Sequence, residues 1–273
     1  MFKRSTKKIG SETAQGSREK RAYVIGDVHG RLDLLNDLLQ LIEEDNDRRE
    51  NKETIIVFLG DLIDRGPDSR GVIDLLSTAP PSFAKCYFIK GNHEDVLVRG
   101  LEGEPRLLTP WLKFGGQACA QSYGVDIGAI HGQEEHVIEH VLLSAIPAAH
   151  INFMKNFYES IRFGDYLFVH AGLRPNVPLE QQSAKDMMGI RKEFLESDAD
   201  FGCVVVHGHS VSDAVVIKDN RIGIDTGAYA TGVLTALRIE DDDRSVIQTS
   251  GPADPAFALE DVEANPLFTD NSH

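Results

Sequence analysis

The chain has 273 residues, of which 41% are hydrophobic and 26% are charged, and its formal net charge at pH 7 is −15. This length and hydrophobic content are sufficient for one enzyme domain with a full core. The acidic balance argues against a nucleic-acid-binding protein, which needs basic surface to neutralise phosphates. No apolar run is long enough to span a bilayer and no secretory signal opens the sequence, so we expect no stable membrane insertion.

Three cysteines, Cys86, Cys119 and Cys203, lack metal-site spacing. They are odd in number, and Cys86 and Cys203 lie in predicted core strands, so we expect buried free thiols. A reducing cytoplasm fits best, so we expect a cytoplasmic protein.

Both ends of the sequence differ in composition from its centre. Residues 1–21 contain seven Lys or Arg and two Glu, a charge of +5, which leaves −20 on the rest. The segment is polar and lacks hydrophobic periodicity, which predicts a disordered basic tail over residues 1–20. A weak docking arm for an acidic partner or an anionic membrane is the alternative. The Pro- and Asp-rich residues 251–273 predict a second, peripheral tail, which leaves one domain over residues 21–250.

Strands and helices alternate in the first part of this domain. The predicted elements are a strand at Tyr23–Ile25, a leucine-rich helix over residues 32–42, a strand at Thr54–Leu59, a short helix at Gly71–Leu76 and a strand at Cys86–Ile89. This βαβαβ order predicts parallel neighbouring strands with ligands at their carboxyl ends.

Residues 96–162 have few strand signals. Helical stretches around Glu134–Ala145 and Ile151–Ile161 predict that this region is a helical insertion or cap. The chain then returns to strands, with a tight hairpin at Asp219-Asn220. The predicted strands are Tyr166–Val169, Val204–Val206, Val215–Lys218, Ile222–Ile224, Leu234–Ile239 and Ser245–Thr249.

Five short motifs with glycines follow apolar, β-branched runs. They are Gly-Asp-Val-His-Gly (26–30), Gly-Asp-Leu-Ile-Asp-Arg-Gly (60–66), Gly-Asn-His-Glu (91–94), His-Ala-Gly (170–172) and His-Gly-His (207–209). Each motif places polar side chains at the end of a predicted buried strand, where several loops can converge. Acids, histidines and an amide gathered in this way predict a metal site.

The types of ligand indicate the kind of metal. Asp27 and His29 are two residues apart and point to the same side of an extended segment. A carboxylate together with an imidazole suits Mn²⁺, Fe or Zn²⁺ better than Ca²⁺. For this motif alone, an Asx-turn with a surface histidine is the alternative. The Asp61 carboxylate can bridge two cations, and Asn92, His170 and one of His207 and His209 can complete the second metal's shell.

His93 adjoins Asn92 and is expected to point the opposite way, toward a substrate. Such a histidine can protonate a leaving oxygen if a carboxylate holds its other nitrogen, and Asp64 is the candidate. Arg65 offers a planar fork that suits phosphate oxygens. A surface ion pair between Asp64 and Arg65 is the alternative.

The five motifs, in this order, resemble those of the PPP-type, calcineurin-like metallophosphoesterases, and especially the bacterial and phage branch of these serine/threonine protein phosphatases. The resemblance covers residues 21 to 240. It implies an α/β (α+β) fold in which a two-sheet β-sandwich is flanked by helices, with the helical insertion as a cap. It also implies a dinuclear centre with two divalent ions. Mn²⁺ is the expected metal, and Fe or Zn²⁺ are the alternatives.

Carried over to this sequence, the resemblance implies two overlapping ligand sets. One metal is held by Asp27, His29 and Asp61, and the other by Asp61, Asn92, His170 and His209. We choose His209 over His207 because Gly-His-Ser, followed by Ile-Asp-Thr-Gly (224–227), resembles the family's Gly-His-Thr…Asp-Thr-Gly ending.

Phosphate-binding arginines are also implied. Arg65 matches one, and Arg191 in Gly-Ile-Arg matches another, although Met188-Gly189 stands where the family usually has a tryptophan. Lys90 stands where many relatives have arginine; it keeps the charge but not the bidentate geometry.

The implied function is phosphomonoester hydrolysis by a metal-bridging hydroxide, with a phosphorylated protein or a small phosphoester as substrate. Asp64 and Glu94 correspond to the protein-phosphatase form, because the family's dinucleoside tetraphosphate hydrolases tend to lack the first acid and to carry Asp at the second position. A symmetrical dinucleoside tetraphosphate hydrolase is the alternative, and a non-catalytic phosphoprotein-binding module is a distant one.

Two further features are explained without catalysis. His136-Val-Ile-Glu-His140 spells a zinc-protease pattern, but no third ligand is identified, so an exposed charged helix is predicted. Trp111, the only tryptophan, is predicted to pack within the insertion, with a substrate-lining role as the alternative.

Overall fold

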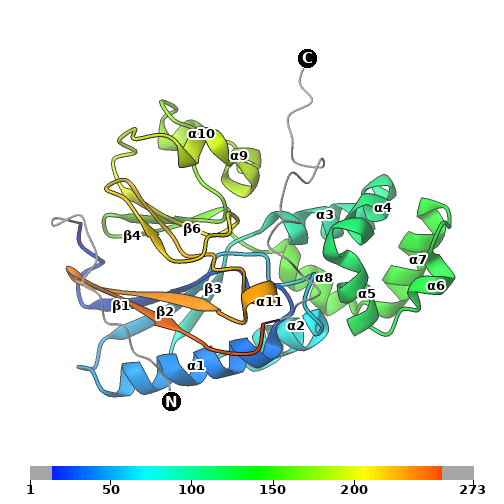
Figure 1. Ribbon diagram of the computed structural model, residues 1–273, viewed down its shortest axis with the longest axis horizontal. Coiled ribbons are helices and arrows are strands. Elements are labelled where there is room, and N and C mark those ends of the chain that lie inside the picture. Colours follow the sequence, from blue (N-terminus) through cyan, green and yellow to red (C-terminus); the bar gives the residue numbers. More distant parts are fainter. Residues whose placement is uncertain (1–13, 254–273) are drawn as a thin grey trace.

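Strands of this chain are buried on both faces, and alternate side chains along a strand enter different cores. In β1 (Lys20–Ile25), Val24 packs into the core between two sheets, whereas Tyr23 packs against helices. In β5 (Tyr166–Val169), Phe168 and Val169 divide in the same way. Because successive side chains of a strand point to opposite faces, two facing sheets with helices outside them result. The computed structural model, which describes residues 14–253, has this arrangement (Figure 1).

Each sheet has five strands and contains both parallel and antiparallel pairs. The order is β10-β9-β1-β2-β3 in the first sheet and β4-β5-β6-β8-β7 in the second. The remaining bounds are β2 (Glu53–Phe58), β3 (Lys85–Phe88), β4 (Ser160–Phe163), β6 (Val204–His207), β7 (Val216–Ile217), β8 (Arg221–Gly223), β9 (Thr235–Glu240) and β10 (Asp243–Gln248). The predicted parallel β1-β2-β3 start is confirmed, and so is the hairpin at Asp219-Asn220, which joins the antiparallel strands β7 and β8.

Helices cover the outer face of each sheet. Leucines of α1 (Leu32–Asp47) and α2 (Ser69–Thr78) pack with Tyr23 on the outer face of the first sheet. Met187 of α9 (Ala184–Gly189) and Phe194 of α10 (Lys192–Leu195) cover the second sheet, where the 3₁₀ turn η3 (Leu179–Gln181) precedes them. In Figure 1, α1 lies below the sheets, and α9 and α10 lie above them.

The helical insertion lies to one side of the sheets (green in Figure 1). It contains α3 (Asn92–Leu101), η1 (Pro105–Leu107), α4 (Leu108–Trp111), η2 (Leu112–Gly116), α5 (Gln117–Ser122), α6 (Ile127–Ile130), α7 (Glu135–Ala145) and α8 (Ala148–Lys155). Its buried side chains, Leu97, Trp111 and Leu142 among them, belong to the same core as α1 and α2. The insertion is therefore continuous with the domain core.

The predicted helix Ile151–Ile161 is wrong at its end, and the predicted insertion boundary at residue 162 is wrong with it. The helix stops at Lys155, and β4 begins at Ser160. Phe163 is buried between the sheets, and Gly164 has a φ of +61°, a conformation that favours glycine. The turn at Gly164 returns the chain into β5, so β4 and β5 pair as an antiparallel hairpin.

The predicted tail over residues 1–20 extends too far, because residues 14–20 pack on the fold. The Gly16 amide donates to the Asp241 carbonyl at 2.7 Å, and the Gln15 amide donates to the Asp165 carboxylate at 2.8 Å. A Cβ at Gly16 would lie 2.9 Å from the Phe163 ring, so the backbone approaches the sandwich closely. Residues 1–13 and 254–273, the rest of both predicted tails, lie outside the described residues.

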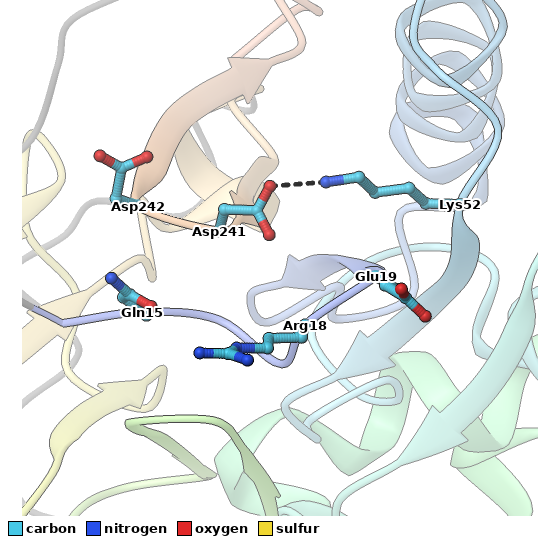
Figure 2. A pocket seen from close by; sticks show the side chains of 6 residues that line it. All are labelled: Gln15, Arg18, Glu19, Lys52, Asp241 and Asp242. Atoms are coloured by element: carbon cyan, nitrogen blue, oxygen red, sulfur yellow. Dashed lines mark hydrogen bonds and ion pairs between the residues drawn. The ribbon is translucent and has the colours of Figure 1, made fainter.

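A surface hollow lies beside this segment, at the amino-terminal ends of β1 and β2 (Figure 2). It is lined by Gln15, Arg18, Glu19, Lys52, Asp241 and Asp242. Within it, the Lys52 ammonium pairs with the Asp241 carboxylate at 2.6 Å. The five motifs follow the opposite ends of the parallel strands, so this hollow is separate from them.

Two further expectations concern membrane helices and cysteines. Over residues 14–253, no single helix is long and apolar enough to cross a membrane; α7 and α8 meet that test only as a pair bent by 101°. Cys86, Cys119 and Cys203 are all free thiols, and Cys119 is fully buried. The expected burial of Cys86 and Cys203 is wrong, because both are only half-buried.

Candidate metal and phosphate-binding site

The motifs converge within each sheet because the strands that precede them run in parallel, and the two sheets face each other. Asp27 follows β1, Asp61 follows β2, and Asn92 follows β3. His170 and His209 follow β5 and β6 of the second sheet, which are also parallel to each other. The carboxyl ends of such strands lie at one edge of a sheet, so the loops meet there. All six predicted metal ligands are buried: Asp27, His29, Asp61, Asn92, His170 and His209.

Asp61 lies at the centre of these side chains. Its Oδ2 lies 3.7 Å from His29 Nε2 and 3.4 Å from His170 Nε2. Two groups of candidate ligands share this carboxylate. One group is His29, Asp61 and His93, and the other is Asp61, His170 and His209; within each group, the ligand atoms lie within 4.8 Å of one another. Asn92 adjoins the second group, because its Oδ1 lies 2.9 Å from His170 Nε2.

Asp27 lies beside the second group rather than in the first. Its carboxylate accepts the backbone N–H of His209 at 3.0 and 3.2 Å. A Cβ at Gly208 would lie only 2.0 Å from Asp27 Oδ1, so the turn before His209 closes tightly over the carboxylate. The structure thus brings His93, and not Asp27, within reach of His29 and Asp61 in the first group.

The donor atoms fit a metal centre. His209 Nε2 is buried and has no hydrogen-bond partner among residues 14–253. A buried polar nitrogen without a partner is rare in folded proteins, and a metal ion is one way to satisfy it. Carboxylate, amide and imidazole donors together suit a first-row divalent metal.

The pKa values of the site residues are shifted because their ionisable side chains lie close together. Burial lowers the pKa of His170, but the carboxylates of Asp61, Asp27 and Glu94 together outweigh it and raise that pKa to about 10. Burial raises the pKa of Asp61, yet the neighbouring His170 and His93 bring it well below the usual range. For Asp27, burial and the neighbouring Asp225 both raise the pKa. Carboxylates crowded in this way favour the binding of cations.

The backbone at the site is strained. Eight non-glycine residues among the described ones have positive φ, and five of them belong to the motifs: His29, Asp61, Asp64, Arg65 and His209. Such conformations cost energy in residues with a Cβ and persist only where the surroundings hold them.

Glu94 supplies part of that support. Its carboxylate accepts the backbone N–H groups of Asp61 at 2.9 Å, Leu62 at 2.7 Å and Gly91 at 3.0 Å. Glu94 is completely buried, and burial raises its pKa to about 7. Sequence reasoning uses this residue only as a mark of substrate class and misses its role as the clamp of the Asp61 loop. Its place directly after the Asn-His pair was the available signal.

Asp64 and His93 are in direct contact. Asp64 Oδ2 lies 2.6 Å from His93 Nδ1, and both side chains are buried. The alternative of a surface ion pair between Asp64 and Arg65 is therefore wrong. Arg65 instead donates to the Tyr229 hydroxyl at 2.6 Å, and its guanidinium lies 4.6 Å from the Tyr229 ring centroid. Tyr229, on α11 (Ala228–Thr231), is a site residue that sequence reasoning misses.

Arg191 lies near Arg65. Burial and the neighbouring Arg65 lower the pKa of Arg191. Its guanidinium has no hydrogen bond or ion pair with another residue of the described part of the chain, so its donors remain available. Lys90 is half-buried, and its side chain makes no such contact within residues 14–253 either.

His207 lies outside both groups of ligands. Its ring packs against that of Phe194, with centroids 5.1 Å apart, and a Cβ at Gly223 would lie 3.0 Å from its Cε1. His136 and His140 are exposed on α7, and neither belongs to a metal-competent group in the described part of the chain. An exposed helix, as predicted, accounts for them.

Comparisons with known proteins show the family to which the chain is related. The family model described as calcineurin-like phosphoesterase matches residues 20–236. The asymmetrical bis(5'-nucleosyl)-tetraphosphatase PrpE of Oceanobacillus iheyensis is 40% identical over 235 residues, which cover 79% of this chain and 87% of that protein. Serine/threonine-protein phosphatase 2 of Escherichia coli K12 is 27% identical over 231 residues, which cover 81% of this chain and 94% of that protein.

Solved structures share the fold. A structure described as a putative diadenosine tetraphosphatase has a TM-score of 0.60 and 20% identity, and the match covers 88% of this chain and 99% of that chain. The predicted two-sheet fold is thereby confirmed.

Proposed function

Because the chain belongs to the calcineurin-like phosphoesterase family, and is therefore a hydrolytic enzyme, we propose that it hydrolyses phosphomonoesters with a poor leaving group. The substrate class that we propose is phosphoserine or phosphothreonine in a protein. The observation that carries this proposal is the buried contact of 2.6 Å between Asp64 and His93.

Two divalent metal ions would be held by the convergent motifs. We assign Asp27, His29 and Asp61 to one ion, and Asp61, Asn92, His170 and His209 to the other. The two ligand groups that share Asp61 support His29, Asp61, His170 and His209, and the unpartnered Nε2 of His209 supports its place as a ligand. Asp27 and Asn92 lie outside those groups and are assigned from the family resemblance, each in contact with the second group. Mn²⁺ is the proposed ion, with Fe or Zn²⁺ as alternatives. When bound, such ions supply Lewis acidity toward phosphate oxygens and a hydroxide nucleophile near neutral pH.

Arg65 and Arg191 would bind the phosphoryl group. Two guanidinium groups near the carboxylate cluster can orient the phosphate and stabilise charge on its equatorial oxygens. The available donors of Arg191 support this role. Arg65 is held in place by its stack on Tyr229.

His93 would donate a proton to the leaving oxygen. With Nδ1 held by Asp64, the opposite nitrogen Nε2 faces the centre, 3.9 Å from Asp61 Oδ2. As the P–O bond breaks, the Nε2 proton passes to the departing alkoxide, and Asp64 stabilises the imidazolium before donation. A serine or threonine alkoxide needs this proton, because it is a very poor leaving group.

A second candidate is the hydrolysis of dinucleoside tetraphosphates. The names of several relatives favour it, including the protein that is 40% identical. A departing nucleotide phosphate is already stable as an anion, so it needs the Asp64–His93 pair less than an alkoxide does. The buried Asp64–His93 pair is therefore the reason for preferring phosphomonoesters as substrates.

A side-by-side assay with Mn²⁺ separates the two candidates. We expect phosphoserine or phosphothreonine peptides to be hydrolysed, with kcat/KM for diadenosine tetraphosphate at least roughly tenfold lower. A higher kcat/KM for the dinucleotide would reject the phosphomonoester assignment. Its products would then distinguish the two cleavage modes: AMP and ATP indicate asymmetrical cleavage, and two ADP indicate symmetrical cleavage.

His93→Asn provides the matched test of the proton donor. We expect a loss of roughly 10²–10⁴-fold on phosphoserine peptides and a smaller loss on p-nitrophenyl phosphate, whose leaving group needs little protonation.

The compartment that we propose is the reducing cytoplasm, consistent with three free thiols.

A further inference from the structure

Trp111 contacts the Asp64–His93 pair from the helical insertion. Its indole Nε1 donates a hydrogen bond of 2.7 Å to Asp64 Oδ2, the oxygen that also contacts His93 Nδ1. Asp64 and Trp111 are 0% and 2% exposed, so water does not compete for this oxygen. Hydrogen bonds in such surroundings hold their partners firmly.

The segment after Trp111 fixes the orientation of the indole. A Cβ at Gly116 would lie 2.4 Å from two ring carbons of Trp111, so the backbone packs directly on the indole. The intervening turn, Leu112–Gly116, is a kink between two helices, in which Phe114 and Gly115 leave helical φ/ψ. Gly115 has a φ of +110°, a conformation that favours glycine.

The same turn holds the residue next to Asp64. The Arg65 amide donates to the Gly115 carbonyl at 3.0 Å, and a Cβ at Gly115 would lie 2.7 Å from Arg65 Cγ. Asp64 and Arg65 have φ values of +73° and +66°, so two successive strained residues are supported from the insertion.

We propose that Trp111 is a positioning residue for proton donation: its N–H fixes the Asp64 carboxylate, which in turn orients the His93 imidazole toward the leaving oxygen. This inference rests on the proposed function of the Asp64–His93 pair. Burial raises the pKa of Asp64, and hydrogen bonds from His93 and Trp111 counteract that rise. The indole thus supports both the position of the carboxylate and its ionised form.

The test compares leaving groups. Trp111→Phe keeps an aromatic ring but removes the N–H, and it is assayed with Mn²⁺ on phenyl phosphate and p-nitrophenyl phosphate. We expect kcat on phenyl phosphate to fall roughly tenfold or more, less than the roughly 10²–10⁴-fold expected for loss of the general acid itself. On p-nitrophenyl phosphate the loss should be clearly smaller. Because both residues act through His93, Trp111→Phe combined with Asp64→Asn should be no slower than Asp64→Asn alone.

Tyr123→Phe is the matched control. It removes another buried hydrogen bond of the insertion, between the Tyr123 hydroxyl and His150 Nδ1 at 2.9 Å, and Tyr123 makes no hydrogen bond to Asp64. It should change both substrates equally. If Trp111→Phe unfolds, benzothienylalanine at position 111 keeps the bicyclic shape and replaces only the N–H with sulfur.

Fluorescence gives a readout without turnover. Trp111 is the only tryptophan, so the emission reports the surroundings of this indole alone, including its contact with Asp64. Asp64→Asn should shift the emission of the metal-free protein, whereas Tyr123→Phe should not.

The outcomes separate this inference from the proposed function. A leaving-group-selective loss in His93→Asn but equal losses in Trp111→Phe would overturn the role of Trp111 alone. Additive losses in the Trp111→Phe, Asp64→Asn double variant, or an emission that is unchanged in Asp64→Asn, would do the same. Equal losses on both substrates in His93→Asn would overturn the proton-donor role itself, and this inference with it.

Discussion

Gly91 lies against Asp61 so closely that no side chain fits between them. A Cβ at position 91 would lie 2.2 Å from Asp61 Oδ1 and 2.3 Å from the Asp61 backbone nitrogen. The glycine that precedes Asn92 therefore decides where the central carboxylate lies.

Gly91→Ala should displace Asp61 and reduce metal binding. The added methyl group meets the Asp61 backbone nitrogen, which donates to Glu94, and the Asp61 carboxylate, which accepts the backbone N–H of His93 at 3.1 Å. Neither group can move aside cheaply. We expect fewer bound metal ions per chain by elemental analysis and a large loss of turnover. Gly128→Ala is the control, because Gly128 lies on α6 and the nearest atom to a Cβ there is 3.2 Å away. Full metal content in Gly91→Ala would contradict the assigned position of Asp61.

Asp61→Ala should abolish turnover and release at least one metal ion. Asp61 is the residue shared by both ligand groups, so its removal affects both ions. Metal content and hydrolysis of p-nitrophenyl phosphate are measured on the same preparation. Two bound ions together with full turnover would show that another residue bridges the metals.

The two histidines of the fifth motif should behave differently. His209→Ala should lose metal, because His209 belongs to a ligand group, whereas His207, whose Nε2 likewise lacks a partner among residues 14–253, does not. His207→Ala should keep metal but lower stability, since His207 packs against Phe194 in the interior. Metal analysis and thermal unfolding of both variants check this difference. The reverse pattern would exchange the two assignments.

Tyr229→Phe should weaken substrate binding more than it slows turnover. The variant keeps the ring beneath Arg65 but removes the hydroxyl that accepts its hydrogen bond at 2.6 Å. One hydrogen bond corresponds to a change in KM of about 2- to 10-fold. Steady-state kinetics on phosphopeptides measures KM and kcat separately. A pure loss in kcat would mean that Tyr229 acts in the chemical step.

Local pattern in the sequence determined which residues carry the chemistry. Apolar, β-branched runs predict the strands, and the polar motif after each run marks its carboxyl end. Parallel pairing of neighbouring strands then implies that Asp27, Asp61 and Asn92 meet at one edge of the first sheet, and His170 and His209 at one edge of the second. This much follows from the period of a strand and the direction of its neighbours, which are properties of short segments.

Packing between distant segments decided how those residues are held. Trp111 reaches Asp64 across 47 positions, and Tyr229 reaches Arg65 across 164. Glu94 clamps the Asp61 loop from the start of α3, and β4 exists because it pairs with β5. No repeating pattern in the sequence marks any of these contacts. Each depends on which surfaces the folded chain brings together. Hydrophobic burial, which drives that assembly, is non-directional, so the apolar pattern does not specify which distant surfaces will pair.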